Sequence, residues 1–293
     1  MAFFLVPLAL LLERLVGYPD WLFRRIGHPV TWMGALITWL ELRLNTGTNR
    51  RARGMLMLAL LLLTCLAVSL LIIAITRRIP FGWVLEAVLA TSLLAQRALG
   101  QAVKAVADGL TLSLAAGRHA VSHIVGRDTE VLDESGVAGA AIESLAESTS
   151  DGVVAPLFWL IVFGLPGIVL YKAINTADSM VGHRNERFAA FGWASAVVDD
   201  VVNWIPARLS ALLIAGACFF MRRADPEAAW TTALRDARKH ASPNAGWPEA
   251  AFAGALGIQL GGPRSYAGET HALQSFGEGL KPMPADIQPA LIR

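Results

Sequence analysis

Long apolar runs separated by short polar clusters dominate the chain. The run Gly54 to Thr76 contains no charged residue over 23 positions, which as a helix is long enough to cross a hydrocarbon core of ~30 Å. Four further runs are shorter or interrupted, namely 2–12, 81–95, 153–170 and a stretch that ends at 221 and begins between 191 and 207. The pattern predicts an all-α, polytopic integral membrane protein with about five membrane spans or re-entrant segments.

Two of these runs need a closer interpretation. The run 2–12 lacks a basic n-region and a small-residue cleavage site, so we interpret it as a retained span or membrane-dipping helix rather than a signal peptide. The run 153–170 is interrupted by Gly164-Leu165-Pro166-Gly167. Such a break is typical of a re-entrant hairpin, whose non-helical backbone must be covered by protein or line a wet cavity. A hairpin here would return 172–188 to the side from which the chain came.

Composition supports the membrane prediction. Of the 293 residues, 55% are hydrophobic and 16% are charged, whereas soluble domains carry about 25% charged residues. The mean hydropathy is +0.50. The net charge of +2 gives no argument for nucleic-acid binding. Cys65 and Cys218 both lie in apolar runs without CxxC spacing, which favours packing roles over metal binding or a disulfide.

The distribution of basic residues predicts orientation and organisation. If five spans alternate, nineteen Lys and Arg residues outside the spans fall on one side of the membrane and five on the other. The side with nineteen is then expected to face the cytoplasm. We expect a multi-pass protein of the cell (inner) membrane. We expect a single domain, 1–293, with a membrane region (1–221) and a polar tail (222–293). The tail opens with a predicted helix that Asp225 caps and Pro226 begins.

One acidic set precedes the fourth apolar run. Glu143, Glu147 and Asp151 are spaced four and four, so each step advances only ~40° around a helix and all three carboxylates share one face. A solvated acidic face is the ordinary interpretation. Because this face leads into an apolar run, where carboxylates are costly unless paired or wet, a Mg²⁺ site is the competing hypothesis.

A second polar set follows the same run. Asn175 and Asp178 lie three apart and face the same way on a helix, while Lys172, Arg184 and Arg187 offer donors for phosphate or carboxylate. The alternative is an interfacial loop with snorkelling cations.

A third set lies among valines. Asp199 and Asp200 are adjacent, so at most one of them points inward, and Asn203 follows one helical turn later. His119 and His123 have metal-compatible spacing, but no third ligand accompanies them. The chain contains neither GxxxxGK[ST] nor GxGxxG, so any nucleotide must be held by something other than a P-loop or a Rossmann turn.

Several long motifs together resemble one family. They occur in the order "GYPDWLFRRIGHPVTWMG", "GRDTEVLDESGVAGAAIESLAESTSDGVVAPLFW", "YKAINTADSMVGHRNERFAAFGWASAVVDDVVNWIPARL" and "KHASPNAGWPEAAFAGALGIQLGGPRSYAG". The series covers nearly the whole chain and resembles the CobD/CbiB family, the adenosylcobinamide-phosphate synthases of cobalamin (vitamin B12) biosynthesis. Ser148 stands where the family pattern leads us to expect Asn.

The resemblance implies an ATP-dependent ligase that forms an amide. Its corrinoid substrate would be adenosylcobyric acid, whose propionate carboxylate is joined to the amine of (R)-1-amino-2-propanol O-2-phosphate. ATP and Mg²⁺ are the implied cofactors, the lipid bilayer surrounds the protein, and other enzymes of the pathway are conceivable partners.

On this interpretation each polar set has a role in activating the carboxylate, neutralising phosphate oxygens and accepting a proton from the amine. The expected catalytic residues are Glu147, Asp151, Asp178 and Asp199. The expected substrate- and phosphate-binding residues are Lys172, Asn175, Arg184, Arg187, Asn203 and Asn244, the last in the "SPNAGWPEA" motif. The expected metal ligands are Glu143, Glu147 and Asp151. We expect the carboxylates of the three sets to converge at the cytoplasmic edge of the spans, and Glu227 and Glu249 only to complement helix dipoles.

Two other functions fit parts of the pattern. A transporter or channel for a polar solute would also place acids and broken spans in the membrane, but the spans are few and no inverted repeat is evident. A scaffold for other pathway enzymes would not need three carboxylate sets. An assay for product formation from ATP, Mg²⁺ and both substrates distinguishes the ligase from the transporter and the scaffold.

Overall fold

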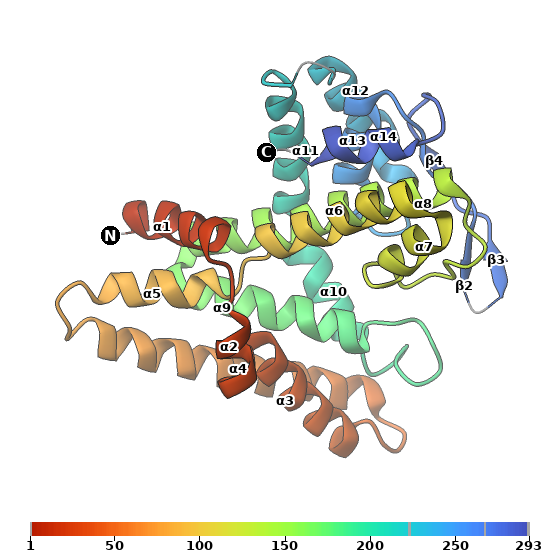
Figure 1. The fold of residues 1–293 in the computed structure, drawn as a ribbon. Coiled ribbons are helices and arrows are strands. Elements are labelled where there is room, and N and C mark those ends of the chain that lie inside the picture. The colour runs from red at the N-terminus through yellow and green to blue at the C-terminus, as the bar shows by residue number, and fades with distance from the viewer. Residues whose placement is uncertain (1, 222–223, 267, 292–293) are drawn as a thin grey trace. The chain divides into compact units, whose positions relative to one another are not determined.

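The computed structural model describes residues 2–221, 224–266 and 268–291 and consists mainly of helices (Figure 1). The chain divides into two compact units. Unit 1 comprises Met1–Gln96 and Ala155–Asn203, and unit 2 comprises Arg97–Val154 and Trp204–Arg293. Each unit is therefore built from two separate stretches of sequence.

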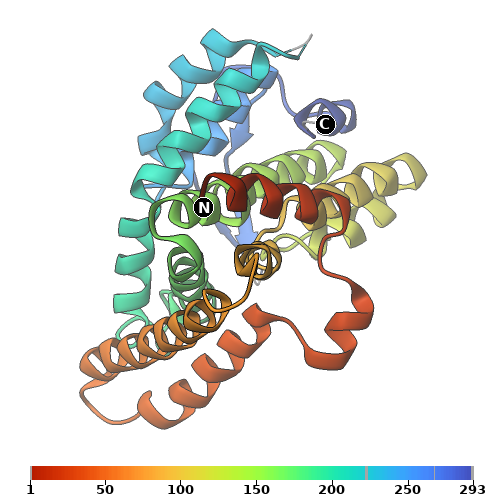
Figure 2. The ribbon, with the colours of Figure 1, turned by 90° about the vertical axis from the view of Figure 1, so that its left-hand side faces the viewer.

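Unit 1 contains seven helices in its described residues. They are α1 (Ala2–Leu15), α2 (Asp20–Ile26), α3 (Pro29–Leu44), α4 (Arg50–Thr76), α5 (Gly82–Thr91), α9 (Ala155–Val181) and α10 (Trp193–Val202). Helices α3 and α4 lie side by side (Figures 1 and 2), and α9 packs against both. Ile37, Leu61 and Ile168 are fully buried where these helices meet.

The start of α3 explains the "HPVT" sequence. The Nδ1 atom of His28 accepts a hydrogen bond from the backbone N–H of Val30, and the Thr31 hydroxyl accepts one from the backbone N–H of His28. Pro29 occupies the first helical position, where a missing N–H costs nothing. This segment therefore closes the helix end with its own side chains.

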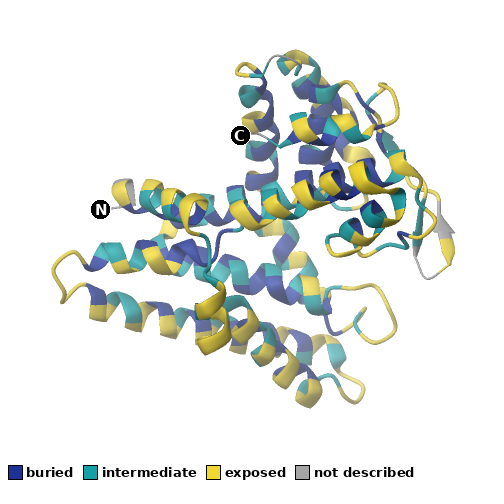
Figure 3. Cartoon of the chain, in the orientation of Figure 1, coloured by how far each residue is buried: buried dark blue, intermediate teal, exposed yellow. Residues whose placement is uncertain are grey.

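Helix α4 is the predicted long apolar helix. Its 27 residues are apolar enough and long enough to cross a membrane, and it buries Met57, Leu61 and Cys65 while leaving Leu63 and Leu71 more than half exposed. Exposed positions recur along its length in Figure 3. A side covered with large apolar residues suits contact with lipid chains.

Helix α9 breaks where the sequence predicted it. Gly164 has φ +64° and ψ −151°, outside any helical conformation. Beyond the break, a Cβ atom on Gly167 would lie 2.1 Å from the carbonyl oxygen of Trp159. Residues eight apart in a straight helix are about 12 Å apart along the axis, so this contact means that the chain folds back on itself. The predicted hairpin is confirmed as a feature of the backbone.

Unit 2 contains the remaining elements. Its helices are α6 (Gln96–Leu112), α7 (Leu114–Ser122), α8 (Glu134–Thr149), α11 (Trp204–Cys218), α12 (Pro226–Asp236), α13 (Gly246–Leu256) and α14 (Pro284–Ala290), with a π-helical segment at Ser150–Val154 and a 3₁₀ turn at Ala237–Lys239. Helices α12 and α13 pack closely, because Ala229, Ala233 and Ala250 are small and a Cβ atom on Gly254 would lie 2.2 Å from the Ala228 carbonyl oxygen. The Asp225 carboxylate and Pro226 begin α12 as predicted.

The tail departs from the all-α prediction. In its described residues it contains four short strands, β1 (Leu260–Gly261), β2 (Arg264–Tyr266), β3 (Glu269–His271) and β4 (Ser275–Phe276). β1 pairs antiparallel with β4, and β2 with β3. Strands of two or three residues are too short to produce a period-2 pattern, so the sequence predicted loops and short helices here.

Two helical regions in the described residues could cross a membrane by length and composition, Arg50–Thr76 and Glu134–Val181, and the α10–α11 pair raises the number to three if it forms one span. The predicted count of five is not confirmed. α1 has 14 residues and α5 has 10, fewer than the ~20 that a spanning helix needs.

Candidate functional site

A charged cavity in unit 2 brings together residues from two of the four quoted motifs, which lie about 100 residues apart along the chain. Its volume is about 150 Å³, and its polar lining consists of Arg127, Glu143, Ser144, Glu147, Glu249 and Arg264. Asp133 caps α8 by accepting the backbone N–H of Gly136, and this helix carries Glu143 and Glu147. Glu249 lies in the first turn of α13 and Arg264 on β2.

Glu143 is the centre of this arrangement. One carboxylate oxygen accepts the backbone N–H of Gly261 at 2.6 Å. The other pairs with the Arg127 guanidinium and, at 3.1 Å, with Nη2 of Arg264. Both of its oxygens are therefore engaged by protein donors, and its carboxylate holds the two arginines in place while offsetting only one of their two charges.

Glu249 closes the buried end of the cavity. Its side chain is 1% exposed, and its oxygens lie 3.5 Å from Nη2 of Arg264 and 3.6 Å from Nε2 of His240. Burial, reinforced by the Glu143 charge, raises the pKa of Glu249 well above its ordinary value. Burial lowers the pKa of His240, and the charge of Arg264 lowers it further.

The predicted metal ligands fit this geometry only in part. Among the residues that the structure describes, no three His, Cys, Asp or Glu side chains are placed to hold a metal ion together. Glu143 is committed to arginines, Glu147 lies exposed at the rim of the cavity, and Asp151 follows in the π-helical segment. Because Mg²⁺ in phosphate-transfer sites needs only one or two carboxylates, with substrate oxygens and water completing its shell, Glu147 and Asp151 remain the candidates.

A buried polar cluster lies within unit 1. The Tyr171 hydroxyl donates to the Asn203 side-chain oxygen at 2.9 Å, and the Asn203 amide donates to Oδ2 of Asp199 at 2.9 Å. Asp199 is 9% exposed, and its Oδ1 atom has no hydrogen-bond partner among the described residues. A buried carboxylate oxygen without a partner is costly, so this oxygen is suited to bind a ligand.

Three other predicted residues surround this cluster. Asp178 lies within electrostatic range of Asp199, and the neutral Asn175 side chain lies beside the Asp199 carboxylate. The Lys172 ammonium donates to the Asn175 side-chain oxygen at 3.2 Å. The structure thus brings together Lys172, Asn175, Asp178, Asp199 and Asn203, which the sequence had divided between two sets.

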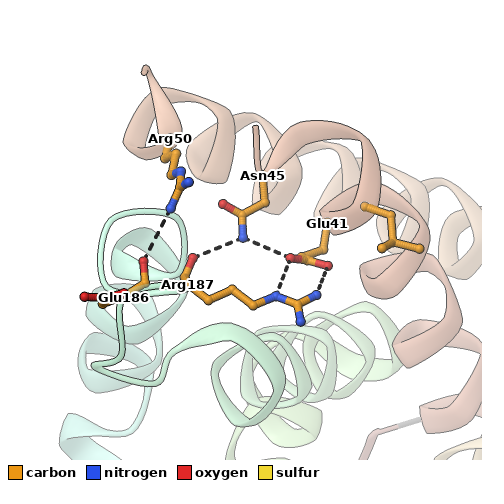
Figure 4. A pocket seen from close by; sticks show the side chains of 6 residues that line it. Glu41, Asn45, Arg50, Glu186 and Arg187 are labelled. Atoms are coloured by element: carbon orange, nitrogen blue, oxygen red, sulfur yellow. Dashed lines mark hydrogen bonds and ion pairs between the residues drawn. The ribbon is translucent and has the colours of Figure 1, made fainter. Parts of the chain in front are cut away.

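Arg187 has a different partner from the one predicted. Its guanidinium forms a two-pronged ion pair with Glu41 of α3, with N···O distances of 3.1 and 2.9 Å (Figure 4). The Asn45 amide donates both to Glu41, at 2.9 Å, and to the Arg187 carbonyl, at 3.1 Å. The ion pair lowers the pKa of Glu41. These contacts fix the loop between α9 and α10 on α3 and line a pocket of about 460 Å³.

Two predicted binding residues lie apart from both clusters. Arg184 is exposed in the loop that Arg187 anchors. Asn244 is buried before α13 and accepts a hydrogen bond from Arg208 at 3.3 Å. Asn244 does not line the unit 2 cavity, although Glu249 of the same motif does.

Comparison with known proteins agrees with the motifs. A sequence model described as "CobD/Cbib protein" matches residues 6–292. The chain belongs to the CobD/CbiB family. It is 49% identical to a cobalamin biosynthesis protein CobD of Rhodobacter capsulatus over 97% of this chain and 90% of that protein. The CobD of Sinorhizobium fredii is also 49% identical, over 92% and 84%. No solved structure matches the chain.

Membership of the CobD/CbiB family places the chain in cobalamin biosynthesis. The expected convergence of the three carboxylate sets stays a prediction, since Glu143 and Glu147 belong to unit 2 while Asp178 and Asp199 belong to unit 1. Each set is assembled within its own unit.

The sequence analysis did not identify three charged residues of the cavity. Arg127, Glu249 and Arg264 lie in the "GRDTEVLDES", "SPNAGWPEA" and "GGPRSYAG" motifs, which could have marked them. Glu249 was expected only to complement a helix dipole. Glu249 does lie in the first turn of α13, but its side chain is also buried in the cavity against Arg264, which that expectation did not include.

Proposed function

We propose that this CobD/CbiB protein is an amide-forming ligase at the cell (inner) membrane. It joins a propionate carboxylate of adenosylcobyric acid to the amine of (R)-1-amino-2-propanol O-2-phosphate and gives adenosylcobinamide phosphate. The observation that carries the proposal is the meeting of two of the four family motifs, the second and the fourth along the chain, at one small charged cavity in unit 2. A cavity lined by carboxylates and guanidiniums suits ionic substrates.

The reaction needs activation before the amide can form. The corrinoid carboxylate takes a phosphoryl group from ATP, giving an acyl phosphate and ADP; the amine then attacks the acyl carbon, and inorganic phosphate leaves. Mg²⁺, when bound, neutralises the phosphate oxygens during this transfer. Glu147 and Asp151 are the proposed carboxylates for that ion.

The residues of unit 1 have the complementary tasks. Lys172, Arg184 and Arg187 are proposed to neutralise phosphate or carboxylate groups, with Asn175 and Asn203 as hydrogen-bonding partners. Asn244, which belongs to unit 2, is proposed as a further hydrogen-bonding partner. An amine must lose a proton as the amide forms, and the proposed acceptor is Asp178 or Asp199. The buried Oδ1 atom of Asp199 is the strongest support for a ligand beside this cluster.

The test uses the full chain purified in detergent. With ATP, Mg²⁺ and both substrates, mass spectrometry should detect adenosylcobinamide phosphate, and omission of any one component should abolish it. The same preparation in liposomes should not accumulate either substrate. Uptake without product would favour a transporter, and neither uptake nor product would favour a scaffold.

A further inference from the structure

The unit 2 cavity is small, and its size restricts what can enter it. Ligand pockets for drug-sized molecules measure about 300–1,000 Å³, whereas this cavity measures about 150 Å³. Neither a corrin ring nor a whole nucleotide fits. A short aliphatic chain with one phosphate group does.

The buried part of the cavity carries paired guanidiniums. The Arg127 side chain is 10% exposed and that of Arg264 is 15% exposed, and Glu143 holds both in place. Arginine forks match the oxygens of phosphate, and a fork that is already fixed loses little entropy on binding. The raised pKa of Glu249 reduces the negative charge opposite them.

The rim of the cavity has the opposite character. Glu147 lies exposed there, four residues along α8 from the buried Glu143. Because the corrinoid is too large to enter, an amine that reacts with its carboxylate must lie at the rim. An aminoalkyl phosphate bound here would therefore point its phosphate inward.

We propose that this cavity is the binding site of the aminoalkyl phosphate, with its phosphate on Arg127 and Arg264 and its amine at the rim beside Glu147. The assignment rests on the proposed ligase function and names the substrate that the cavity takes.

Steady-state kinetics of Arg264→Lys test the assignment. Lysine keeps a positive charge beside Glu143 but loses the fork. We expect the KM for the aminoalkyl phosphate to rise at least about tenfold, as for loss of one charge-assisted hydrogen bond, and the KM values for ATP and corrinoid to stay within about twofold. Arg127→Lys provides a second variant if the first does not fold. Arg235→Lys is the matched control, because Arg235 is also ion-paired in unit 2 but lies outside the cavity.

A binding measurement separates this assignment from the ligase function. Calorimetric titration without ATP or corrinoid should show that the wild-type protein binds 1-amino-2-propanol O-2-phosphate at least about tenfold more tightly than 1-amino-2-propanol. Both lysine variants should lose that difference. If the wild type makes product and both folded variants keep the wild-type KM for the amine, the cavity assignment is wrong while the ligase proposal stands. A rise confined to the KM for ATP would also contradict the cavity assignment. If the wild type makes no product, the ligase proposal fails, and the titration still decides what the cavity binds.

Discussion

Two glutamates four positions apart on α8 have different surroundings. Glu143 is buried and paired with two arginines, whereas Glu147 is exposed at the cavity rim. Their spacing predicted a shared face but not this difference, because burial depends on Arg127 and Arg264, and Arg264 lies more than 100 positions further along the chain.

Replacement of Glu147 tests its proposed role. We expect Glu147→Gln to fold and stay in the membrane but to lower ligation at least about 100-fold, the scale of losing an electrostatic contact in a transition state. Partial recovery at high Mg²⁺ would identify the lost contact as metal binding. Glu227→Gln, an exposed change in the first turn of α12, should be silent. The measurement is activity at matched protein abundance across a Mg²⁺ titration. A fully active Glu147→Gln protein would show that the acidic face of α8 is an ordinary solvated face and not a metal site.

Asp236 is a buried acid with a structural task. It is 0% exposed and accepts hydrogen bonds from Arg235 and from the backbone N–H of Gly277, and it pairs with Lys239. The Arg235 hydrogen bonds hold the pKa of Asp236 well below its ordinary value. The stabilisation is therefore present above about pH 4, the unfolded pKa, and is lost as the pH falls toward the lower folded pKa.

We expect Asp236→Asn to lower the free energy of unfolding by about 3 kcal/mol at pH 7. The difference from wild type should shrink as the pH falls below about 4. Unfolding in detergent over a pH series measures both effects. Asp108→Asn, which breaks only an exposed pair with Lys104, should cost less than about 1 kcal/mol. A constant difference at all pH values would contradict the ionic explanation.

Among the elements, the α9 hairpin was predictable from a short stretch of sequence. Gly and Pro cluster at 164–167, and both interrupt helices by known local rules. The strands of the tail were not predictable, because pairs such as Leu260 with Phe276 depend on contacts between distant residues. For the same reason the role of Glu249 in the cavity was not predictable, because its sequence neighbours indicate only the first turn of a helix.

Glycine at position 167 allows the hairpin to close. A Cβ atom there would lie 2.1 Å from the Trp159 carbonyl oxygen, which has little freedom to move. We expect Gly167→Ala to lower the midpoint of thermal unfolding, at a cost of about 1–3 kcal/mol from overpacking. Gly216→Ala on α11, where nothing lies within 4 Å of the added atom, should leave the midpoint unchanged or raise it. Equal midpoints for the two variants would mean that the hairpin opens easily.

At the scale of the whole molecule, composition and one uninterrupted apolar run predicted a helical membrane protein. The number of spans was harder to predict, because apolar runs such as 81–95 also occur where a short helix packs against its neighbours. The division into two units could not be read from the sequence, since each unit joins segments that are far apart along the chain.

Membrane association has a direct test. Because α4 presents a long apolar surface, we expect the protein to remain in the membrane fraction after washing with high salt and with alkali, and to be released only by detergent. Immunoblots of the washed pellets and supernatants give the answer. Release by alkali alone would show that α4 does not cross the bilayer.

The volume of the unit 2 cavity also bears on product fidelity. A small cavity excludes larger substrates by steric overlap, but it rejects a smaller homologue only by the contacts that the homologue lacks, and one missing methyl group is worth about 1–3 kcal/mol. If the cavity binds the aminoalkyl phosphate, ethanolamine phosphate, which has the same backbone as aminopropanol phosphate but lacks its methyl branch, would compete whenever its concentration is about 10–200 times higher. The cell's supply of the two amines, rather than the protein alone, would then determine which side chain the finished corrinoid carries.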